Sequence, residues 1–176
     1  MSLFFDCPVP REENVLVAFA DLTGFVSISN KLSDPEMFSL MASYFQMVAS
    51  EMDECGGRLI KCMGDAALIL FPENLAEAGI LALMDLRPKA EEFMKSRGFP
   101  SRLKIGIHFT SAILGDVHGR LDVYGKGINT AAILEGKGVA LTPQAFRQLS
   151  DEGRKLFKKH TPSVYYIPLE LKHDKD

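Results

Sequence analysis

Cysteine is scarce in this sequence, and no motif is built from it. The three cysteines, Cys7, Cys55 and Cys62, are an odd number and form no Cys-x-x-Cys pair. Such a set predicts neither a disulfide framework nor a zinc–thiolate site. Reduced thiols are typical of the cytoplasm, so we expect a cytoplasmic protein.

Long apolar runs and targeting signals are missing as well. The apolar run from Ala66 to Phe71 is far too short to cross a bilayer. The N-terminus has no basic stretch followed by an apolar one, as a secretory signal would have. We therefore expect no membrane segment in this chain.

An excess of charge of one sign is also lacking. The formal net charge is −3. The basic residues near the end form only a small cluster, made of Arg154, Lys155, Lys158 and Lys159. Because neither feature creates a broad positive field, nucleic acid is not an expected partner.

Apolar content is ample, and strand-like and helix-like patterns alternate along the chain. With 176 residues and 47% hydrophobic content, the chain can bury one sizeable core without disulfides or metals. No linker, repeat or low-complexity stretch divides the sequence. We expect a single domain over residues 1–176.

Two acidic residues fall at the tips of predicted strands. Residues 14–20 form a compact apolar run that ends at Asp21, which is typical of a buried strand with a carboxylate at its tip. Residues 58–62 and 66–71 predict two further strands that a short turn joins into a hairpin. Asp65 lies on that turn, so both aspartates are candidate site residues.

Two long helices are predicted between and after these strands. Asp34 and Pro35 predict the N-cap and first turn of one, which continues with apolar residues at helical spacing, namely Met37, Met41, Phe45, Val48 and Met52. Asn74 and Glu77 have the spacing of a capping box for the second helix. Pro88 should kink or interrupt that helix.

The second half of the chain predicts a further run of short elements. They are strands over residues 103–109, 112–117 and 121–124, a short helix from near Asn129, another capped at Thr142, and a closing strand over 164–169 that Pro168 should confine to a sheet edge. Strands dominate this half, which favours a sheet with helical cover.

Four segments in a fixed order resemble one family. VAFADLTGF (17–25) and GGRLIKCMGDAALILF (56–71) resemble the metal-binding halves of class III adenylyl and guanylyl cyclases, and LKIGIHF (103–109) and LDVYGKGINTAA (121–132) complete the pattern. The resemblance covers about residues 15–149. It implies a mixed α/β (α+β) fold of the ferredoxin-like, palm-type kind, with a mostly antiparallel sheet covered by helices.

The resemblance also implies an activity and an assembly. The adenylyl cyclases of the family convert ATP to 3′,5′-cyclic AMP and pyrophosphate at the interface of two chains, with metals from one protomer and base recognition from the other. A homodimer would contain two such sites. We therefore expect an adenylyl cyclase that acts as a homodimer, with a heterodimer as the other arrangement.

Asp21 and Asp65 match the family's two metal-binding aspartates. The resemblance implies that the backbone carbonyl of Leu22 is the third protein ligand. Cyclisation requires the ribose 3′-hydroxyl to lose its proton and attack the α-phosphate. Two Mg²⁺ or Mn²⁺ ions held by such oxygen ligands acidify that hydroxyl and neutralise the departing pyrophosphate. For each aspartate taken alone, ordinary turn chemistry explains its position equally well.

Gly24 and Phe25 match the family's phosphate-binding turn. Backbone N–H groups of a glycine-containing turn between a strand and a helix can receive a triphosphate. A glycine in such a turn can also serve conformation alone. Val26 stands where the family often has Thr, so one phosphate contact is expected to be weaker.

Lys61 and Asp122 match the family's adenine-recognising pair. The adenine amino group donates to a carboxylate and its ring N1 accepts from an ammonium, whereas guanine presents the opposite arrangement. The pair therefore favours ATP over GTP. The alternatives are a solvated strand lysine and an aspartate that forms a turn.

Asn129 matches the asparagine that orients the ribose, although a helix N-cap would also explain it. Active family members usually carry an Arg four residues later, where this chain has Ile133. Losing one transition-state donor typically costs about 10²–10³ in rate, so we expect reduced activity. Arg120, Lys126 and Lys137 are the cations that could replace the missing Arg.

Two other functions stay open. A chain that keeps the fold and nucleotide binding but has lost turnover through Ile133 would be a regulatory dimerisation module. Another palm-type enzyme, such as a diguanylate cyclase, would carry a Gly-Gly-acidic-acidic-Phe hairpin, which this sequence lacks. Whether the chain is an active cyclase or a regulatory module depends on whether a cation of this chain, or of a partner chain in a heterodimer, reaches the space that the missing Arg leaves.

Overall fold

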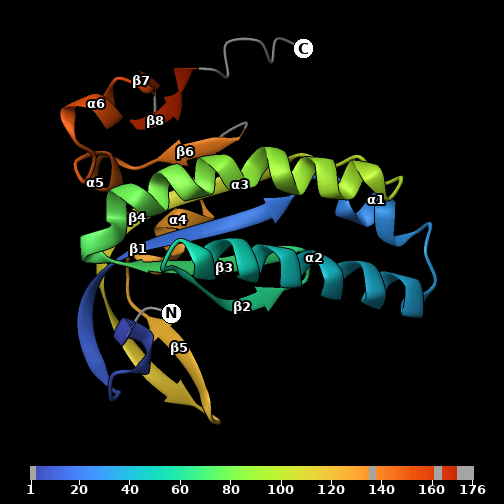
Figure 1. Ribbon diagram of the computed structural model, residues 1–176, viewed down its shortest axis with the longest axis horizontal. Helices are drawn as coiled ribbons and strands as arrows, with labels where there is room; N and C mark the ends of the chain where they lie inside the picture. Colours follow the sequence, from blue (N-terminus) through green and yellow to red (C-terminus); the bar gives the residue numbers. More distant parts are fainter. Residues whose placement is uncertain (1–2, 135–137, 161–163, 170–176) are drawn as a thin grey trace.

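The computed structural model describes residues 3–134, 138–160 and 164–169. These residues form one eight-stranded sheet, and two long helices lie side by side on one of its faces (Figure 1). The strands are β1 (Arg11–Leu22), β2 (Arg58–Met63), β3 (Ala66–Pro72), β4 (Leu103–Val117), β5 (Arg120–Tyr124), β6 (Val139–Leu141), β7 (Phe157–His160) and β8 (Tyr165–Pro168). The helices are η1 (Leu3–Asp6), α1 (Phe25–Ser29), α2 (Asp34–Glu54), η2 (Glu73–Leu75), α3 (Ala76–Ser96), α4 (Ile128–Ala132), α5 (Pro143–Phe146) and α6 (Asp151–Arg154).

The strand order is β2-β3-β1-β4-β6-β8-β7, and β5 pairs with β4 outside this path. The described strand pairs are antiparallel except β4 with β6, which is parallel. Short hairpins join β2 to β3 and β4 to β5, whereas α3 connects β3 to β4. The expected fold, a mostly antiparallel sheet covered by helices, is therefore confirmed.

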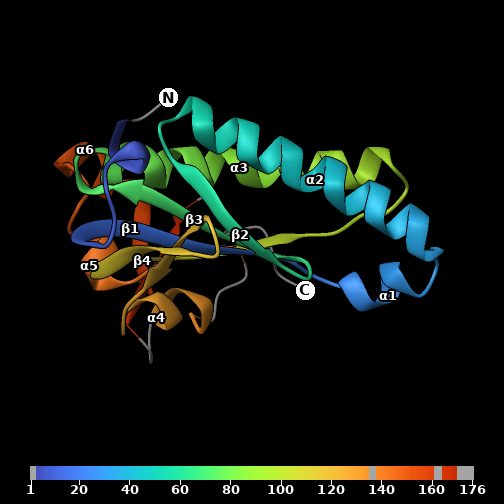
Figure 2. The same cartoon turned by 90° about the horizontal axis from the view of Figure 1, so that it is seen from below.

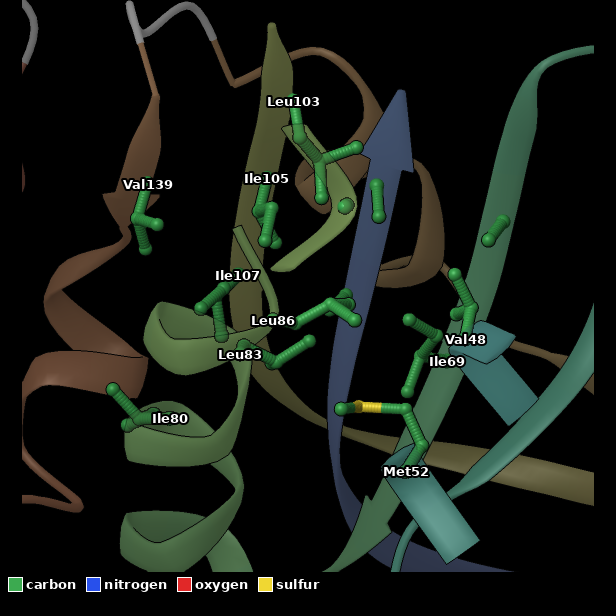
Figure 3. Close-up of a cluster of buried hydrophobic side chains, with 14 of the residues drawn as sticks. Val48, Met52, Ile69, Ile80, Leu83, Leu86, Leu103, Ile105, Ile107 and Val139 are labelled. Atoms are coloured by element: carbon green, nitrogen blue, oxygen red, sulfur yellow. The ribbon is translucent and has the colours of Figure 1, made fainter. Parts of the chain in front are cut away.

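The centre of the sheet is buried on both faces, because β1 alternates two apolar sets. Leu16, Ala18, Ala20 and Leu22 belong to the core under α2 and α3, and Val15 and Val17 belong to a second core on the other face. In the first core, Val48 and Met52 of α2 and Leu83 and Leu86 of α3 lie over the sheet (Figure 3). In the second, α4 packs against the sheet, and Figure 2 shows α4 opposite α2 and α3.

The starts of both long helices differ from the prediction. Ser33, not Asp34, is the N-cap of α2, and Glu36 completes a capping box by accepting from the Ser33 N–H at 2.8 Å. The Asn74–Glu77 capping box is wrong, because the turn η2 leads directly into α3. The Glu77 carboxylate instead accepts hydrogen bonds from the backbone and side chain of Ser150, which ties α3 to the start of α6.

Tertiary packing also overrides three expectations about individual helices and strands. Pro88 does not interrupt α3, since buried residues on both sides of it, Leu86 and Ala90, hold the helix against the sheet. Residues 103–117 form one strand rather than two, because β1 pairs without a break from Leu22↔Leu103 to Arg11↔Leu114, across the gap expected at 110–111. The closing strand β8 lies between β6 and β7, so it is not the edge, and Pro168 is accommodated as its last residue.

Candidate active site

Asp21 and Asp65 lie at the same end of the sheet. Asp21, near the end of β1, is paired with Ala66, the first residue of β3, and Asp65 directly precedes Ala66 on the hairpin turn. The strand register therefore brings together two aspartates that are 44 residues apart in the chain. The expected juxtaposition of two carboxylates follows from this pairing.

The charges around Asp21 indicate how the carboxylates interact. Partial desolvation raises the pKa of Asp21, the negative charge of Asp65 raises it further, and Lys104 lowers it. Lys104 stands directly opposite Asp21 in the pairing of β1 with β4. Sequence reasoning missed Lys104, because an exposed residue in a strand gives no signal of which residue its partner strand places beside it.

The donor set fits a divalent cation that takes only part of its oxygen ligands from the protein. Within the described ranges, no group of three or more His, Cys, Asp or Glu side chains could hold a metal ion. The Leu22 side chain is buried in the core, so only its backbone could contribute to a site. Two carboxylates and a carbonyl leave room for phosphate and water oxygens, as Mg²⁺ prefers. Binding such an ion would relieve the repulsion between Asp21 and Asp65.

Tyr44 of α2 is a buried neighbour of this pair. Its side chain is fully buried, and its hydroxyl has no hydrogen-bond partner among the described residues. Burial raises the pKa of Tyr44, and the charges of Asp21 and Asp65 raise it further, so the phenol stays neutral. The apolar positions predicted for α2 included Phe45 but not Tyr44, so sequence reasoning missed both the burial of Tyr44 and this electrostatic contact.

The turn after β1 has the geometry of a helix N-terminus. Gly24 is the N-cap of α1 with φ of 76° and ψ of 14°, a left-handed conformation that favours glycine. Its carbonyl accepts from the N–H of Ser27 at 3.0 Å, while N–H groups of a first helical turn have no acceptor within the helix. The Phe25 side chain packs on the core, which leaves its backbone N–H as the group available to a ligand.

Lys61 and Asp122 form an ion pair across 61 residues of sequence. Lys61 Nζ donates to Asp122 Oδ1 at 2.7 Å and to Oδ2 at 2.9 Å. Burial raises the pKa of Asp122, but the hydrogen bonds from Lys61, from the Val123 N–H and from Tyr124 together lower it below its usual range. The structure thus brings together the two residues that the sequence assigned to base recognition.

Tyr124 is a third member of this cluster that sequence reasoning missed. Its hydroxyl donates to Asp122 Oδ2 at 3.2 Å, and Lys61 Nζ lies 5.6 Å from the centre of its ring. Alternation along a strand puts Asp122 and Tyr124 on the same face of β5. That spacing is the signal that could have found it.

Asn129 lies inside α4 rather than at its cap, which is Gly127, so the N-cap explanation is wrong. Its carbonyl accepts from the N–H of Ile133 at 3.1 Å, which places the two residues one turn apart. The Ile133 side chain is 75% exposed.

The three cations that could replace the missing Arg lie at different places. Arg120 begins β5 beside the β4–β5 turn, away from α4. Lys126 is exposed just before α4, and Lys137 lies outside the described residues.

No helix in the part of the chain that the structure describes combines the length and apolarity that crossing a membrane requires. The two 21-residue helices, α2 and α3, instead each place one apolar face on the sheet.

Comparison with known proteins identifies the family. A model of the adenylate and guanylate cyclase catalytic domain matches residues 7–164, so the chain belongs to this family of class III nucleotidyl cyclase domains. An adenylate cyclase of Anabaena cylindrica is 27% identical over 152 residues, which cover 76% of this chain and 30% of the relative. Guanylate cyclase soluble subunit alpha-1 of Canis lupus familiaris is 25% identical over 150 residues, covering 78% and 22%.

The fold agrees with solved cyclase structures. A bacterial light-regulated adenylyl cyclase matches with a TM-score of 0.82 at 19% identity, covering 96% of this chain and 55% of that chain. This chain spans less than a third of the length of the two curated relatives above. Because both adenylate and guanylate cyclases are similar to it, base choice has to be argued from the site.

Proposed function

We propose that this chain is an adenylyl cyclase domain that converts ATP to 3′,5′-cyclic AMP and pyrophosphate. The observation that carries the proposal is the ion pair between Lys61 and Asp122, at 2.7 Å. An ammonium beside a carboxylate offers one donor and one acceptor, which complement N1 and the amino group of adenine. The side chains are partly exposed, at 37% and 16%, so a base can reach them.

The remaining predicted residues have roles consistent with this reaction. Asp21, Asp65 and the Leu22 carbonyl would hold the ions, and two Mg²⁺ or Mn²⁺ ions supply Lewis acidity for the 3′-hydroxyl and the pyrophosphate. The backbone N–H groups at Gly24 and Phe25 would bind the triphosphate. Exposed Asn129 would orient the ribose toward the α-phosphate.

The surface around the base site supports a dimer. Ile113, Val117 and Tyr124 are 42%, 39% and 54% exposed, and the β4–β5 register puts them on the same face of the hairpin as Asp122. Exposed apolar side chains beside a polar site are typical of an interface between chains. We propose a homodimer in which one protomer supplies the metal ligands and its partner the base-recognition pair, with a heterodimer as the alternative.

We place the protein in the cytoplasm. Cys55 and Cys62 are free thiols, and both are exposed. Exposed free thiols suit a reducing compartment, where no oxidant converts them to disulfides.

Reduced turnover is part of the proposal. The exposed end of α4 at Ile133 presents a side chain that cannot donate to a developing negative charge, which typically lowers the rate by about 10²–10³. Arg120 lies at the opposite end of β5, so Lys126 is the better-placed cation in the same chain. The same observation favours a second candidate function, a nucleotide-binding regulatory module without turnover.

The test is a cyclisation assay on purified protein with ATP or GTP and Mn²⁺ or Mg²⁺. We expect slow formation of cyclic AMP, its loss in Asp21→Ala, and an increase of up to about 10²-fold in Ile133→Arg. Silence in the parent chain with activity in Ile133→Arg would identify a disabled cyclase. Silence in both chains would contradict the proposed activity and favour the binding module.

A further inference from the structure

Tyr124 contacts both charged members of the base site. Its hydroxyl donates to Asp122, and its ring lies against the Lys61 ammonium. Val123 between Asp122 and Tyr124 is buried, and Tyr124 is 54% exposed, so the residue is not needed to fill the core. A contact made by an exposed aromatic residue to a ligand-facing ion pair points to a role in the site.

The carboxylate of Asp122 has several donors in the free chain. Lys61 donates to both oxygens, the Val123 N–H donates to Oδ1 at 2.7 Å, and Tyr124 donates to Oδ2. When N1 of a bound base accepts a hydrogen bond from the Lys61 ammonium, that ammonium moves away from the Asp122 carboxylate. The Val123 N–H then holds one oxygen of Asp122 and the Tyr124 hydroxyl holds the other.

Adenine and guanine place opposite hydrogen-bonding groups at neighbouring positions. Adenine has an acceptor at N1 and a donor at C6, whereas guanine has a donor at N1 and an acceptor at C6. The same lysine and aspartate could therefore serve guanine if their charged groups exchanged places. Discrimination depends on what keeps the carboxylate opposite C6 when Lys61 is engaged.

We propose that the Tyr124 hydroxyl is a specificity-determining group, which holds the Asp122 carboxylate opposite C6 of the base and so selects adenine over guanine. This inference rests on the proposed adenylyl cyclase function. Tyr124→Phe removes the hydroxyl and keeps the ring that faces Lys61, so the variant isolates the hydrogen bond. Tyr165→Phe is the matched control, because Tyr165 lies on β8 and stacks on His160 at 4.6 Å.

The experiment measures binding, so it does not depend on turnover. Isothermal titration with Mn²⁺ compares 3′-deoxy-ATP with 3′-deoxy-GTP, which lack the hydroxyl that the reaction uses. We expect Tyr124→Phe to lower the ratio of the ATP-analogue affinity to the GTP-analogue affinity by several-fold, up to about tenfold, the effect of one hydrogen bond. Tyr165→Phe should leave the ratio at the parent value.

The other outcomes overturn either the Tyr124 inference alone or the adenine assignment as well. If the parent prefers the ATP analogue and Tyr124→Phe keeps that preference, the role of Tyr124 is wrong and the adenylyl cyclase stands. If the variant weakens both analogues equally and also melts at a lower temperature, Tyr124 is structural and the inference is again wrong. If the parent shows no preference, or binds neither analogue, the adenine assignment fails and the Tyr124 inference fails with it.

Discussion

The surroundings of Asp21 in the folded chain disfavour its ionisation. Desolvation and the charge of Asp65 raise its pKa, and the opposing effect of Lys104 is smaller than these two together. A raised pKa in the folded state means that ionisation is less favourable there than in the unfolded chain. The penalty is therefore present above the folded-state pKa and disappears as the pH falls below the unfolded value.

We expect Asp21→Asn to raise the melting temperature of the metal-free protein at neutral pH, because it removes this penalty. The difference from the parent should shrink as the pH falls through the raised pKa of Asp21. Excess Mn²⁺ should reverse the order, since only the parent gains stability from binding the ion. Thermal melts with a chelator and with Mn²⁺ measure both effects. Identical melting curves of parent and variant at every pH would show that ionised Asp21 does not destabilise the folded chain.

At the scale of elements, the close approach of α4 to β4 sets the position of Asn129. A Cβ on Gly106 of β4 would lie 2.1 Å from the carbonyl oxygen of Ala131 in α4. That oxygen belongs to the backbone, so a side chain at 106 cannot be accommodated by a rotamer change. The helix that carries Asn129 would have to move instead.

We expect Gly106→Ala to destabilise the fold by about 1–3 kcal/mol, the usual effect of overpacking, and to lower the cyclisation rate through the shift of α4. Gly115→Ala is the control on the same strand, because a Cβ there meets nothing within 4 Å. Chemical denaturation and the cyclisation assay compare the two variants. Equal behaviour of both would mean that α4 does not pack on Gly106 as closely as described.

At the scale of the whole molecule, the β4–β5 hairpin extends away from α2 and α3 and exposes apolar residues beside Asp122 (Figure 1). One chain has no described element that covers this face. If the active site forms between two chains, a substitution on this hairpin that breaks the interface should also disable base recognition.

We expect Ile113→Asp to raise the dimer dissociation constant at least about tenfold, because it places a charge in a desolvated contact. Leu81→Asp is the control, since Leu81 is a similarly exposed apolar residue, at 36%, on α3. Sedimentation equilibrium gives the dissociation constants. An unchanged constant in Ile113→Asp would place the interface elsewhere.

Local signals in the sequence predicted most of the elements, and the roles of the site residues stay predictions from the same signals. Apolar alternation, glycine positions and Thr142 located strands, turns and a helix start because these depend on neighbouring residues. The prediction of an Asn74–Glu77 capping box was wrong because the partner of Glu77 is distant in the sequence. Glu77 satisfies distant Ser150 instead, and no local pattern reveals that choice.

The sequence by itself determined which charged groups this protein carries and which strand ends present them. Only the tertiary structure decided their partners: Lys104 opposite Asp21, the bidentate contact of Lys61 with Asp122, and the Tyr124 hydroxyl on the same carboxylate. The physical reason is that strand register is a non-local property. It is fixed by the burial of both faces of the sheet at once, which makes residues far apart in the chain neighbours in space.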